Sequence, residues 1–440
     1  MRRIRRWALV LAAGLVAFAA SASQAAAQAA GAWGRVSFFT SAAQSTAAGS
    51  DEDRSLAELV TTLTYHSAVE PDAQLEFGVD ARFAGYTVEE RDPRVSLYEA
   101  WAGTRLLDGA LRLRAGNLWL TELGGLGAIG GGLAEFGHDA GSGRLRVGAF
   151  GGLEPRPYEA GYVSDVTRYG GYVAFDGRGA LRSTLGYVLI RNGGLTERSV
   201  LSTTNYVPVG PRVFVYQAAE VDLQGPGGQG DGGLTYFFVN GRVRATEMVE
   251  LQGVYHRGRS IDARTIAQDQ INGRPVPPSV LEGLLFESWN GRVTLSLGRG
   301  LRVYGGYGQD RNDETSDAVD RINVGGSASN ILGTGIDATV SLYRMDRGQP
   351  GSYDSWYASA GRSLGSRVYL TGDYTSSLSV VRFLGGDGIV IESRPHTDRY
   401  SVTTIVNLTR AVSLLATAEH TADDTYSENR VLAGLTYRLH

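Results

Sequence analysis

The sequence of 440 residues contains no cysteine and no lysine. Without cysteine, the chain cannot be a disulfide scaffold, and it cannot hold zinc or an iron–sulfur cluster through thiolates. Because lysine is missing, all 42 basic side chains are arginine, and a phosphate-binding loop of the Walker type is excluded. The formal net charge is only −4, which gives no global electrostatic reason to expect nucleic-acid binding.

Long apolar runs are nearly as scarce. Only Trp7–Ala20 approaches the roughly 20 apolar residues that a membrane-spanning helix needs, so the pattern excludes a helical membrane protein. Disorder is also excluded, because 42% of the residues are hydrophobic and the charges nearly cancel. Glycine and tyrosine are abundant instead, with 60 and 22 residues.

The first residues have the three-part layout of a secretory signal peptide. Met1–Arg6 carries four arginines, the apolar run follows, and a small, polar segment then offers Ala-x-Ala cleavage sites such as Ala27–Ala29. The alternative is a membrane anchor helix, for which the apolar run is short. We expect a cleaved signal peptide over residues 1–29 and a single domain over residues 30–440.

Beyond the leader, apolar and polar residues alternate with a period of two. In Ala73–Phe83 every odd position is apolar, and every even position is polar, small or charged. Successive side chains of a strand point to opposite faces, so this pattern predicts strands with one apolar and one wet face. The alternation recurs in segments such as 111–116, 144–149, 292–297, 367–374 and 401–408.

A soluble β-sandwich would also alternate, but three features favour a transmembrane barrel. The segments run about 10 to 13 residues, which suits tilted membrane strands. Aromatic residues lie near strand ends, as interfacial girdles require; examples are Phe38, Tyr65, Phe83, Tyr307, Tyr374 and Tyr437.

The third feature is that tight and long connections alternate, as expected for short periplasmic turns and longer outer loops. The expected tight connections are Leu107–Gly109, Asp176–Gly179, Arg299–Gly300, Gly365–Ser366 and Thr409–Ala411. The expected long connections are Ser41–Arg54, Tyr86–Arg94, Arg257–Phe286, Gln309–Val319 and Met345–Asp354. Strand edges cannot remain bare in lipid, so the sheet must close on itself.

We therefore predict an all-β fold: a single antiparallel up-and-down transmembrane β-barrel of about 22 strands, within a range of 18 to 22. Two strands are weakly supported, because Gly132–Gly137 is short and glycine-rich and Arg198–Val207 alternates poorly before Pro208. Gly388–Arg394 either extends a neighbouring strand or forms a small outer hairpin. No residues remain for a separate plug domain.

The final segment resembles the C-terminal strand of Gram-negative outer-membrane porins. Val431, Ala433, Leu435, Tyr437 and Leu439 alternate with small or polar positions. The resemblance implies recognition by the barrel-assembly machinery and an outer-membrane location in contact with lipid and lipopolysaccharide. The family strand usually ends on an aromatic residue, whereas His440 follows Leu439 here.

A second stretch is similar to a hairpin of porin-like and alginate-export-type barrels. It runs from Glu99-Ala100-Trp101 through the Asp108-Gly109 turn to Arg112-Leu113-Arg114-Ala115-Gly116-Asn117. In those barrels a lumenal glutamate faces an Arg-x-Gly-Arg strand, and Asn117 departs from the last arginine. The resemblance covers about twenty residues and assigns no substrate.

If the apolar positions face lipid, the intervening positions face the lumen. The pore-lining candidates are Arg82, Glu99, Arg112, Arg114, Arg144, Arg146, Arg182, Arg242, Arg244, Arg292, Arg302, Arg367, Asp373, Arg399 and Arg438. Further carboxylates on the same phase include Glu58, Glu76, Glu220, Asp222, Glu250 and Glu419. Many of the arginines adjoin tight turns, and the long loops are acidic.

Two roles are possible for these arginines. They can form a basic constriction that favours anions, because rings of charged side chains set pore selectivity. They can instead pair with lumenal carboxylates and stabilise the barrel wall, which requires no transport role.

The Arg257–Phe286 loop also has two possible interpretations: it folds inward and narrows the pore, or it forms an outer cap. A helix start signal lies near Ser279.

Other apparent motifs carry little weight. Gly125, Gly127 and Gly130 spell G-x-G-x-x-G without the βαβ context of a dinucleotide site. The Asp310–Arg321 stretch lacks the glycine and the final glutamate of a calcium loop. The six histidines are scattered with no nucleophile, base and orienter in a recognisable set. We therefore expect no enzyme, no cofactor, no resident metal and no nucleic-acid partner.

The leading hypothesis is a porin-like channel for passive diffusion of small hydrophilic solutes, leaning toward anions. The alternative is a non-conducting barrel with a structural, adhesive or partner-docking role. A third hypothesis is a substrate-specific exporter with a binding patch at Arg112, Arg114 and Glu99. The solute and the oligomeric state do not follow from the sequence.

Overall fold

The computed structural model describes residues 32–49, 53–67, 75–87, 91–156, 159–225, 228, 231–260, 262–276, 283–313, 318–348, 350–384 and 390–439. The expected signal peptide lies outside these residues, and so does His440. Within them, no helix has both the length and the apolar character needed to cross a membrane.

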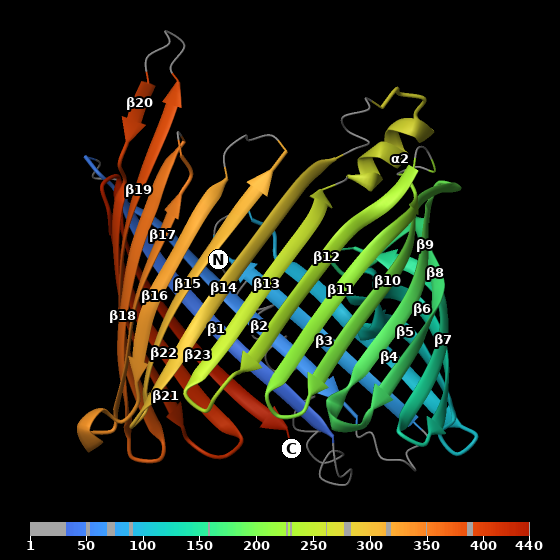
Figure 1. Cartoon of the computed structure of the whole chain (residues 1–440), viewed down its shortest axis with the longest axis horizontal. Coiled ribbons are helices and arrows are strands. Elements are labelled where there is room, and N and C mark those ends of the chain that lie inside the picture. The colour runs from blue at the N-terminus through green and yellow to red at the C-terminus, as the bar shows by residue number, and fades with distance from the viewer. Residues whose placement is uncertain are drawn as a thin grey trace.

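The chain forms one closed antiparallel sheet in which each strand except β20 pairs with the strands that precede and follow it around the wall (Figure 1). The first half comprises β1 (Trp33–Ala47), β2 (Asp53–His66), β3 (Leu75–Tyr86), β4 (Arg94–Leu106), β5 (Leu111–Trp119), β6 (Ala128–Ala140), β7 (Gly143–Pro155), β8 (Tyr162–Gly177), β9 (Arg182–Asn192), β10 (Leu195–Val209) and β11 (Val213–Gln224). The second half comprises β12 (Asp231–Arg244), β13 (Val249–Ser260), β14 (Leu284–Gly298), β15 (Leu301–Asn312), β16 (Val319–Ala328), β17 (Ile336–Asp346), β18 (Gly351–Leu364), β19 (Val368–Leu384), β20 (Val390–Ser393), β21 (His396–Asn407), β22 (Val412–Asp423) and β23 (Tyr426–Leu439).

The barrel closes because β1 pairs with both β2 and β23, so that Gly34 lies opposite Leu439. Strand β20 pairs only with the outer end of β19, and β21 pairs with the rest of β19. Strand β20 therefore extends the line of β21, and 22 strands form the wall. This confirms the predicted fold and strand number, including the two weakly supported strands, which are parts of β6 and β10.

We call the end of the barrel where β1 begins and β23 ends the inner end, and the opposite end, which carries α2 (Ala263–Ile271), the outer end (Figure 1). Several inner-end turns are tight, as predicted. At the turn between β14 and β15, Arg299 and Gly300 both have positive φ angles of 49° and 78°, a conformation typical of two-residue hairpin turns. Short 3₁₀ turns, η2 (Arg178–Ala180) and η4 (Ile331–Gly333), make two other inner connections.

Two predicted long connections are wrong, because Ser41–Arg54 and Met345–Asp354 consist mostly of strand. Strand β1 continues to Ala47, and its small polar residues pair in register with β2 and β23. Strand β17 likewise continues to Asp346. Backbone hydrogen bonds hold these extensions without needing an apolar face, so periodicity did not reveal them.

The outer wall is apolar at the alternate positions that the sequence pattern assigned to lipid. On β7, for example, the side chains of Leu145 and Val147 are 38% and 48% exposed, whereas Arg146 between them lies on the lumenal face. An isolated sheet with so many exposed apolar side chains would aggregate in water, but a closed barrel can place them in lipid. The closed sheet therefore has the form of a transmembrane β-barrel, with apolar side chains outside and charged side chains on the lumenal face.

One part of the lumen is filled by a small hydrophobic core. The residues that form it are buried and come from β5 to β10 and from η1 (Thr121–Leu126). They are Leu118, Leu120, Leu123, Leu126, Ile129, Leu133, Phe150, Val166, Tyr172, Ala174, Val188, Ile190 and Val200. This core explains why β6 alternates poorly: apolar or small residues occupy most positions on both of its faces.

Candidate functional site: the lumen and its arginines

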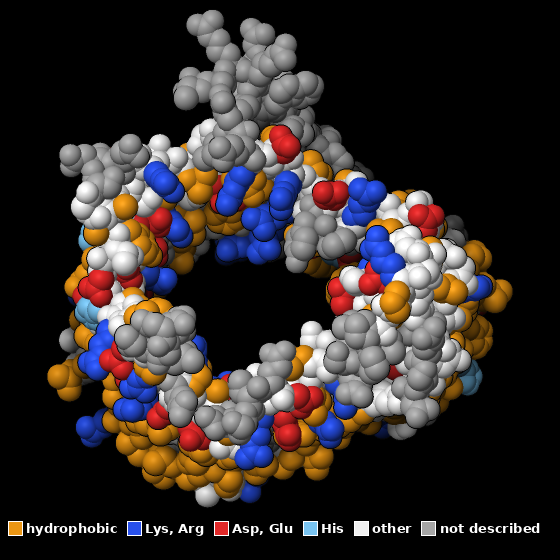
Figure 2. Space-filling view, turned by 90° about the horizontal axis from the view of Figure 1, so that it is seen from above, with side chains coloured by type: hydrophobic (Ala, Val, Ile, Leu, Met, Phe, Trp, Pro, Cys, Tyr) orange, Lys and Arg blue, Asp and Glu red, His pale blue; other side chains and the backbone are white. Residues whose placement is uncertain are grey.

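The barrel is open along its axis, and charged side chains line the opening (Figure 2). Strand alternation places the predicted candidates on the lumenal face of eleven strands, from Arg82 on β3 to Arg438 on β23. Arg367 is the exception in location, because it lies in the inner-end turn between β18 and β19.

The connection between β5 and β6 narrows the lumen. Strand β5 ends early, at Trp119, and the following η1 turn folds inward against β8, β9 and β10. Leu123 and Leu126 of η1 are buried in the lumenal core, and Leu123 lies over Gly186, where a Cβ would come within 2.2 Å of its side chain. The inward element is thus η1, and sequence analysis did not identify it.

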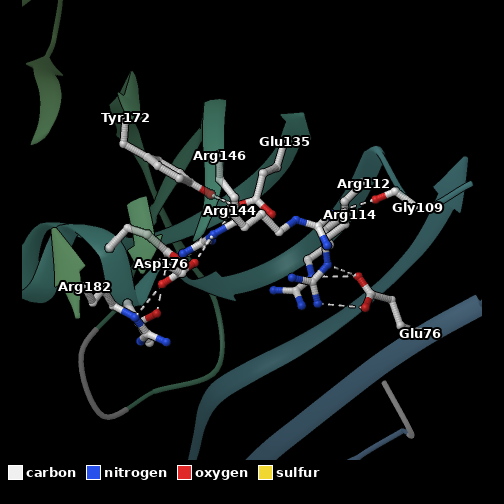
Figure 3. A network of polar contacts seen from close by, with 12 residues as sticks. Glu76, Gly109, Arg112, Arg114, Glu135, Arg144, Arg146, Tyr172, Asp176 and Arg182 are labelled. Atoms are coloured by element: carbon white, nitrogen blue, oxygen red, sulfur yellow. Dashed lines mark hydrogen bonds and ion pairs between the residues drawn. The ribbon is translucent and has the colours of Figure 1, made fainter. Parts of the chain in front are cut away.

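Glu76 on β3 gathers three arginines from neighbouring strands (Figure 3). Its side chain is 2% exposed and accepts from both Nε and Nη2 of Arg112, the latter at 2.7 Å. Arg114 Nε lies 3.0 Å and Arg105 Nη2 3.4 Å from the same carboxylate. One buried carboxylate therefore faces three guanidinium groups, and the summed formal charge of these four residues is positive.

A second network surrounds Arg146 on β7. Its guanidinium donates to Glu122 of η1, Glu135 of β6 and Asp176 of β8, each at 2.7 Å. Tyr172 also donates to Glu135, and Arg182 donates to Asp176 at 2.8 Å. The Glu122 contact ties η1 to the barrel wall, so this network positions the narrowing element.

The two networks meet at a cavity of about 340 Å³ on the lumenal wall. Five arginines line it, including Arg144, which donates to the backbone carbonyl of Gly109 at 3.0 Å. Across both networks, six arginines face four carboxylates: Arg105, Arg112, Arg114, Arg144, Arg146 and Arg182 against Glu76, Glu122, Glu135 and Asp176. We call these ten residues the basic patch. Most of its arginines form ion pairs that link neighbouring strands, yet the summed formal charge of the ten residues is positive.

Glu99, Arg112 and Arg114, the residues of the hypothesised binding patch, line one lumenal pocket together with Trp101. Glu99 accepts from the indole of Trp101 at 3.3 Å, and the guanidinium of Arg114 lies over that indole at 4.0 Å. A bulge in β4 changes the register with β3 near Glu99, and the Asn117 amide donates to the carbonyl of Leu97 in this bulge at 2.7 Å. Asn117, the departure from the family pattern, therefore has a structural role.

Four other predicted arginines lie together on β12, β14 and β15: Arg242, Arg244, Arg292 and Arg302. None of them has an ion pair with any carboxylate that the structure describes, although Glu250 lies opposite Arg244 in register. Arg292 lies over the ring of Tyr304 at 3.7 Å, and Arg242 lies 6.0 Å from the ring of Phe214. We call these four residues the unpaired arginines.

The remaining candidates have separate surroundings. Arg82 lies 3.9 Å from Glu58, and Arg399 lies 3.5 Å from Glu419. Asp373 accepts from the hydroxyl of Tyr357 at 2.6 Å. Arg438 pairs in register with Arg35, so two arginines lie side by side at the inner end.

The long outer loop contains α2, which packs on the outer rim of β9 and β10 (Figure 1). Ile266 and Ala267 are fully buried there, and Arg264 donates to Glu154 and Glu197 at 2.8 Å each. The described part of the loop is thus an outer cap. Asp262 caps the helix, whereas the start signal near Ser279 lies outside the described residues.

Sequence analysis missed several charged residues of the lumen. Glu135 lies in the glycine-rich segment of β6, so its lumenal position follows only once that segment is recognised as a strand. Arg105 and Glu122 flank connections, where alternation gives no phase. Within the described ranges, no three His, Asp or Glu side chains are arranged to hold a metal ion.

None of the known family models and none of the curated protein sequences compared matches this chain. Among solved structures, Acinetobacter baumannii OccAB4 is 11% identical, with a TM-score of 0.44, over 93% of this chain and 99% of that one. Pseudomonas aeruginosa OpdQ is 12% identical, with a TM-score of 0.45, over 93% and 99%. Pseudomonas aeruginosa OccK5 (OpdH) is 9% identical, with a TM-score of 0.45, over 94% and 99%.

Proposed function

We propose that this barrel is a passive outer-membrane channel for small hydrophilic solutes, with a preference for anions. The observation that carries the proposal is an open lumen lined by arginines (Figure 2). A barrel of this size leaves aqueous space beyond what its side chains fill. The alternative, a non-conducting structural barrel, would require the lumen to be occluded.

The anion preference rests on the unpaired arginines and on the positive balance of the basic patch. An arginine that has no carboxylate partner keeps its full charge toward the lumen, whereas a paired arginine contributes a weaker, dipolar field. Arg242 and Arg292 are therefore expected to contribute more to selectivity than Arg112 or Arg114. Selectivity follows from fixed charge near the diffusion path, and no catalytic role is proposed.

The remaining expectations belong to the same proposal. Residues 1–29 serve as a cleaved signal peptide, and the barrel-assembly machinery inserts residues 30–440. The outer leaflet around α2 contains lipopolysaccharide. The unpaired arginines and the basic patch act on whichever small anions enter the lumen.

Reversal potentials under a salt gradient test the selectivity. We expect chloride preference in the unmodified protein and a lower preference after Arg242→Gln with Arg292→Gln. Arg156→Gln is the matched control, because Arg156 lies beyond the end of β7 and pairs with exposed Glu159. Equal reversal potentials in the double variant and the control would contradict the selectivity role of these arginines.

A further inference from the structure

Aromatic side chains form two ring-contact groups on the lumenal wall between β10 and β14. Tyr206 contacts Phe214 with ring centroids 4.5 Å apart, and Tyr216 contacts Phe238 at 5.8 Å. Phe238 then contacts His256 at 6.2 Å, and His256 contacts Phe286 at 5.0 Å. We call these six residues the aromatic track. Phe214 and Tyr216 connect the two parts, because they lie two residues apart on the same face of β11.

All six residues face the lumen. Phe214 lies opposite Arg242, and Phe238 lies opposite His256, in the strand registers. The alternate residues of the same strands, such as Leu251 and Val243, are exposed on the outer wall. The track therefore does not belong to the lipid-facing aromatic girdle.

The track crosses the barrel from one end to the other. Phe214 is the second residue of β11 and lies at the inner end, whereas Phe286 is the third residue of β14 and lies at the outer end. The six rings are therefore distributed along the height of the lumen.

These rings do not form a packed core. Thirteen residues make up the buried lumenal core under η1, and none of the track residues is among them. Each track residue remains partly exposed to the lumen. Contiguous apolar side chains that remain open to water are typical of a surface that binds a ligand.

Polar groups accompany the rings. Asn240 and Gln252 face the lumen beside the track, and their amides are hydrogen-bonded at 3.4 Å. Arg242 lies next to Phe214 at the inner end. Rings that offer an apolar face, together with amides and a guanidinium that bond hydroxyl groups, suit a ligand with both an apolar face and many hydroxyls.

From these observations we propose that the aromatic track binds linear oligosaccharides and guides them through the channel. A pyranose ring presents C–H groups on one face, which pack on the face of an aromatic ring, while its hydroxyls point sideways to polar groups. Aromatic rings spaced along the lumen suit a ligand that repeats, because each sugar unit can pass from one ring to the next. The inference rests on the proposed function, since it requires a conducting lumen.

Block of the ion current by sugars tests this inference in the complete, refolded barrel. The probes are glucose, maltotriose and maltohexaose, and benzoate serves as a single aromatic ring. We expect the blocking affinity to rise from glucose to maltohexaose. A longer sugar contacts more of the track at once, so a block that does not depend on length would overturn the proposal, as would stronger block by benzoate.

Substitutions that remove a ring but keep apolar bulk identify the site. Phe238→Leu and Tyr216→Leu should each weaken the block by maltohexaose about two- to tenfold, in line with the value of one aromatic contact. Phe39→Leu is the matched control, because Phe39 lies on the lumenal face of β1, away from the track, over Gly434. An equal block in all three variants would contradict binding at the track.

The outcomes separate this proposal from the channel itself. A barrel that conducts ions but is not blocked by any sugar contradicts only the track. A folded and inserted barrel that never conducts contradicts both proposals. The ion conductance of each Leu variant shows whether the barrel has folded.

Discussion

At the scale of single residues, the charge of the lumen is set by a few carboxylates that are shared among a larger number of arginines. Glu76 pairs with three guanidinium groups, and Arg146 pairs with three carboxylates. Such networks hold neighbouring strands in register and leave the charge balance positive. A carboxylate at the centre of a network therefore controls both stability and selectivity.

Glu76→Gln tests this dual role. The substitution leaves Arg105, Arg112 and Arg114 without their common carboxylate. We therefore expect the free energy of unfolding to fall by about 1–3 kcal/mol. It also removes one negative charge from the lumen, so chloride preference should rise. Urea unfolding in detergent and reversal potentials measure the two effects.

Glu159→Gln is the control for this variant, because Glu159 pairs with Arg156 at an exposed site. Exposed ion pairs contribute little to stability. If Glu76→Gln is as stable and as selective as the control, the network around Glu76 has neither role.

Alternation predicted which residues face the lumen, but it could not predict their partners. Partners depend on the register between strands, and the bulge in β4 shifts that register beside Glu99. The sequence consequently placed Glu76, Arg112 and Arg114 on the lumenal face, but it did not show that Glu76 accepts from both arginines. A local two-residue period contains no information on such a shift.

At the scale of elements, two connections do more than join strands. The η1 turn narrows the lumen from inside, and α2 caps the outer rim. The strands were predictable because long, regular alternation is a strong signal. The η1 turn was not, because its buried leucines in Thr121–Leu126 have no strand period and contact strands far along the chain.

The packing of η1 against the barrel wall can be tested by substituting Leu123. Leu123→Asp would place a charge in the buried lumenal core, which disfavours the docked position. We expect larger open-channel current noise, because η1 would no longer remain fixed against the wall. Gly125→Asp adds the same charge to the exposed side of the turn and should leave the noise unchanged.

If Leu123→Asp shows the quiet current of Gly125→Asp, η1 does not border the conducting path. Single-channel recordings at one fixed voltage make the comparison. The folded state of both variants can be checked by their resistance to unfolding in detergent.

The docking of α2 should depend on pH through its cap. Asp262 accepts hydrogen bonds from the hydroxyl and the backbone N–H of Thr265, which lower its pKa below the usual carboxyl value. A lowered pKa means that the stabilisation is complete above the ordinary pKa, about 3.9, and is lost as the pH falls through the lowered value. We expect α2 to stay docked from pH 5 to 8 and to loosen only in stronger acid.

A spin label at Gln268→Cys can follow this loosening, since the chain has no other cysteine and Gln268 is exposed. Asp262→Ala should give a mobile label already at pH 7, because loss of a helix cap costs about 0.5–2 kcal/mol. A label that is equally immobile in both proteins at pH 7 would show that the cap does not hold the helix.

At the scale of the whole molecule, 22 strands enclose a lumen whose basic residues are fixed on a closed wall. The predicted strand number is confirmed, since length, strand spacing and the need for closure leave little freedom. The filled sector under η1 was not predictable, because a barrel pattern assumes a polar inner face, whereas β6 to β10 carry apolar residues inside. The open part of the lumen is therefore smaller than the strand number suggests.

Fixed charge on the wall predicts a preference that weakens with salt. The Debye length falls from about 10 Å at 0.1 M to about 3 Å at 1 M, so charges on the wall act on less of the lumen. We expect the chloride preference to be clear in dilute salt and small near 1 M. Reversal potentials at a constant concentration ratio measure this trend, and a preference independent of salt would contradict a fixed-charge origin.

The central claim is that this barrel conducts, and single-channel recording of the refolded protein in a planar bilayer tests it most directly. The account predicts stable, discrete current steps, and under a salt gradient it predicts a reversal potential that favours chloride. Protein that is shown to be folded and inserted, yet gives no steps, would contradict the account and leave a structural barrel.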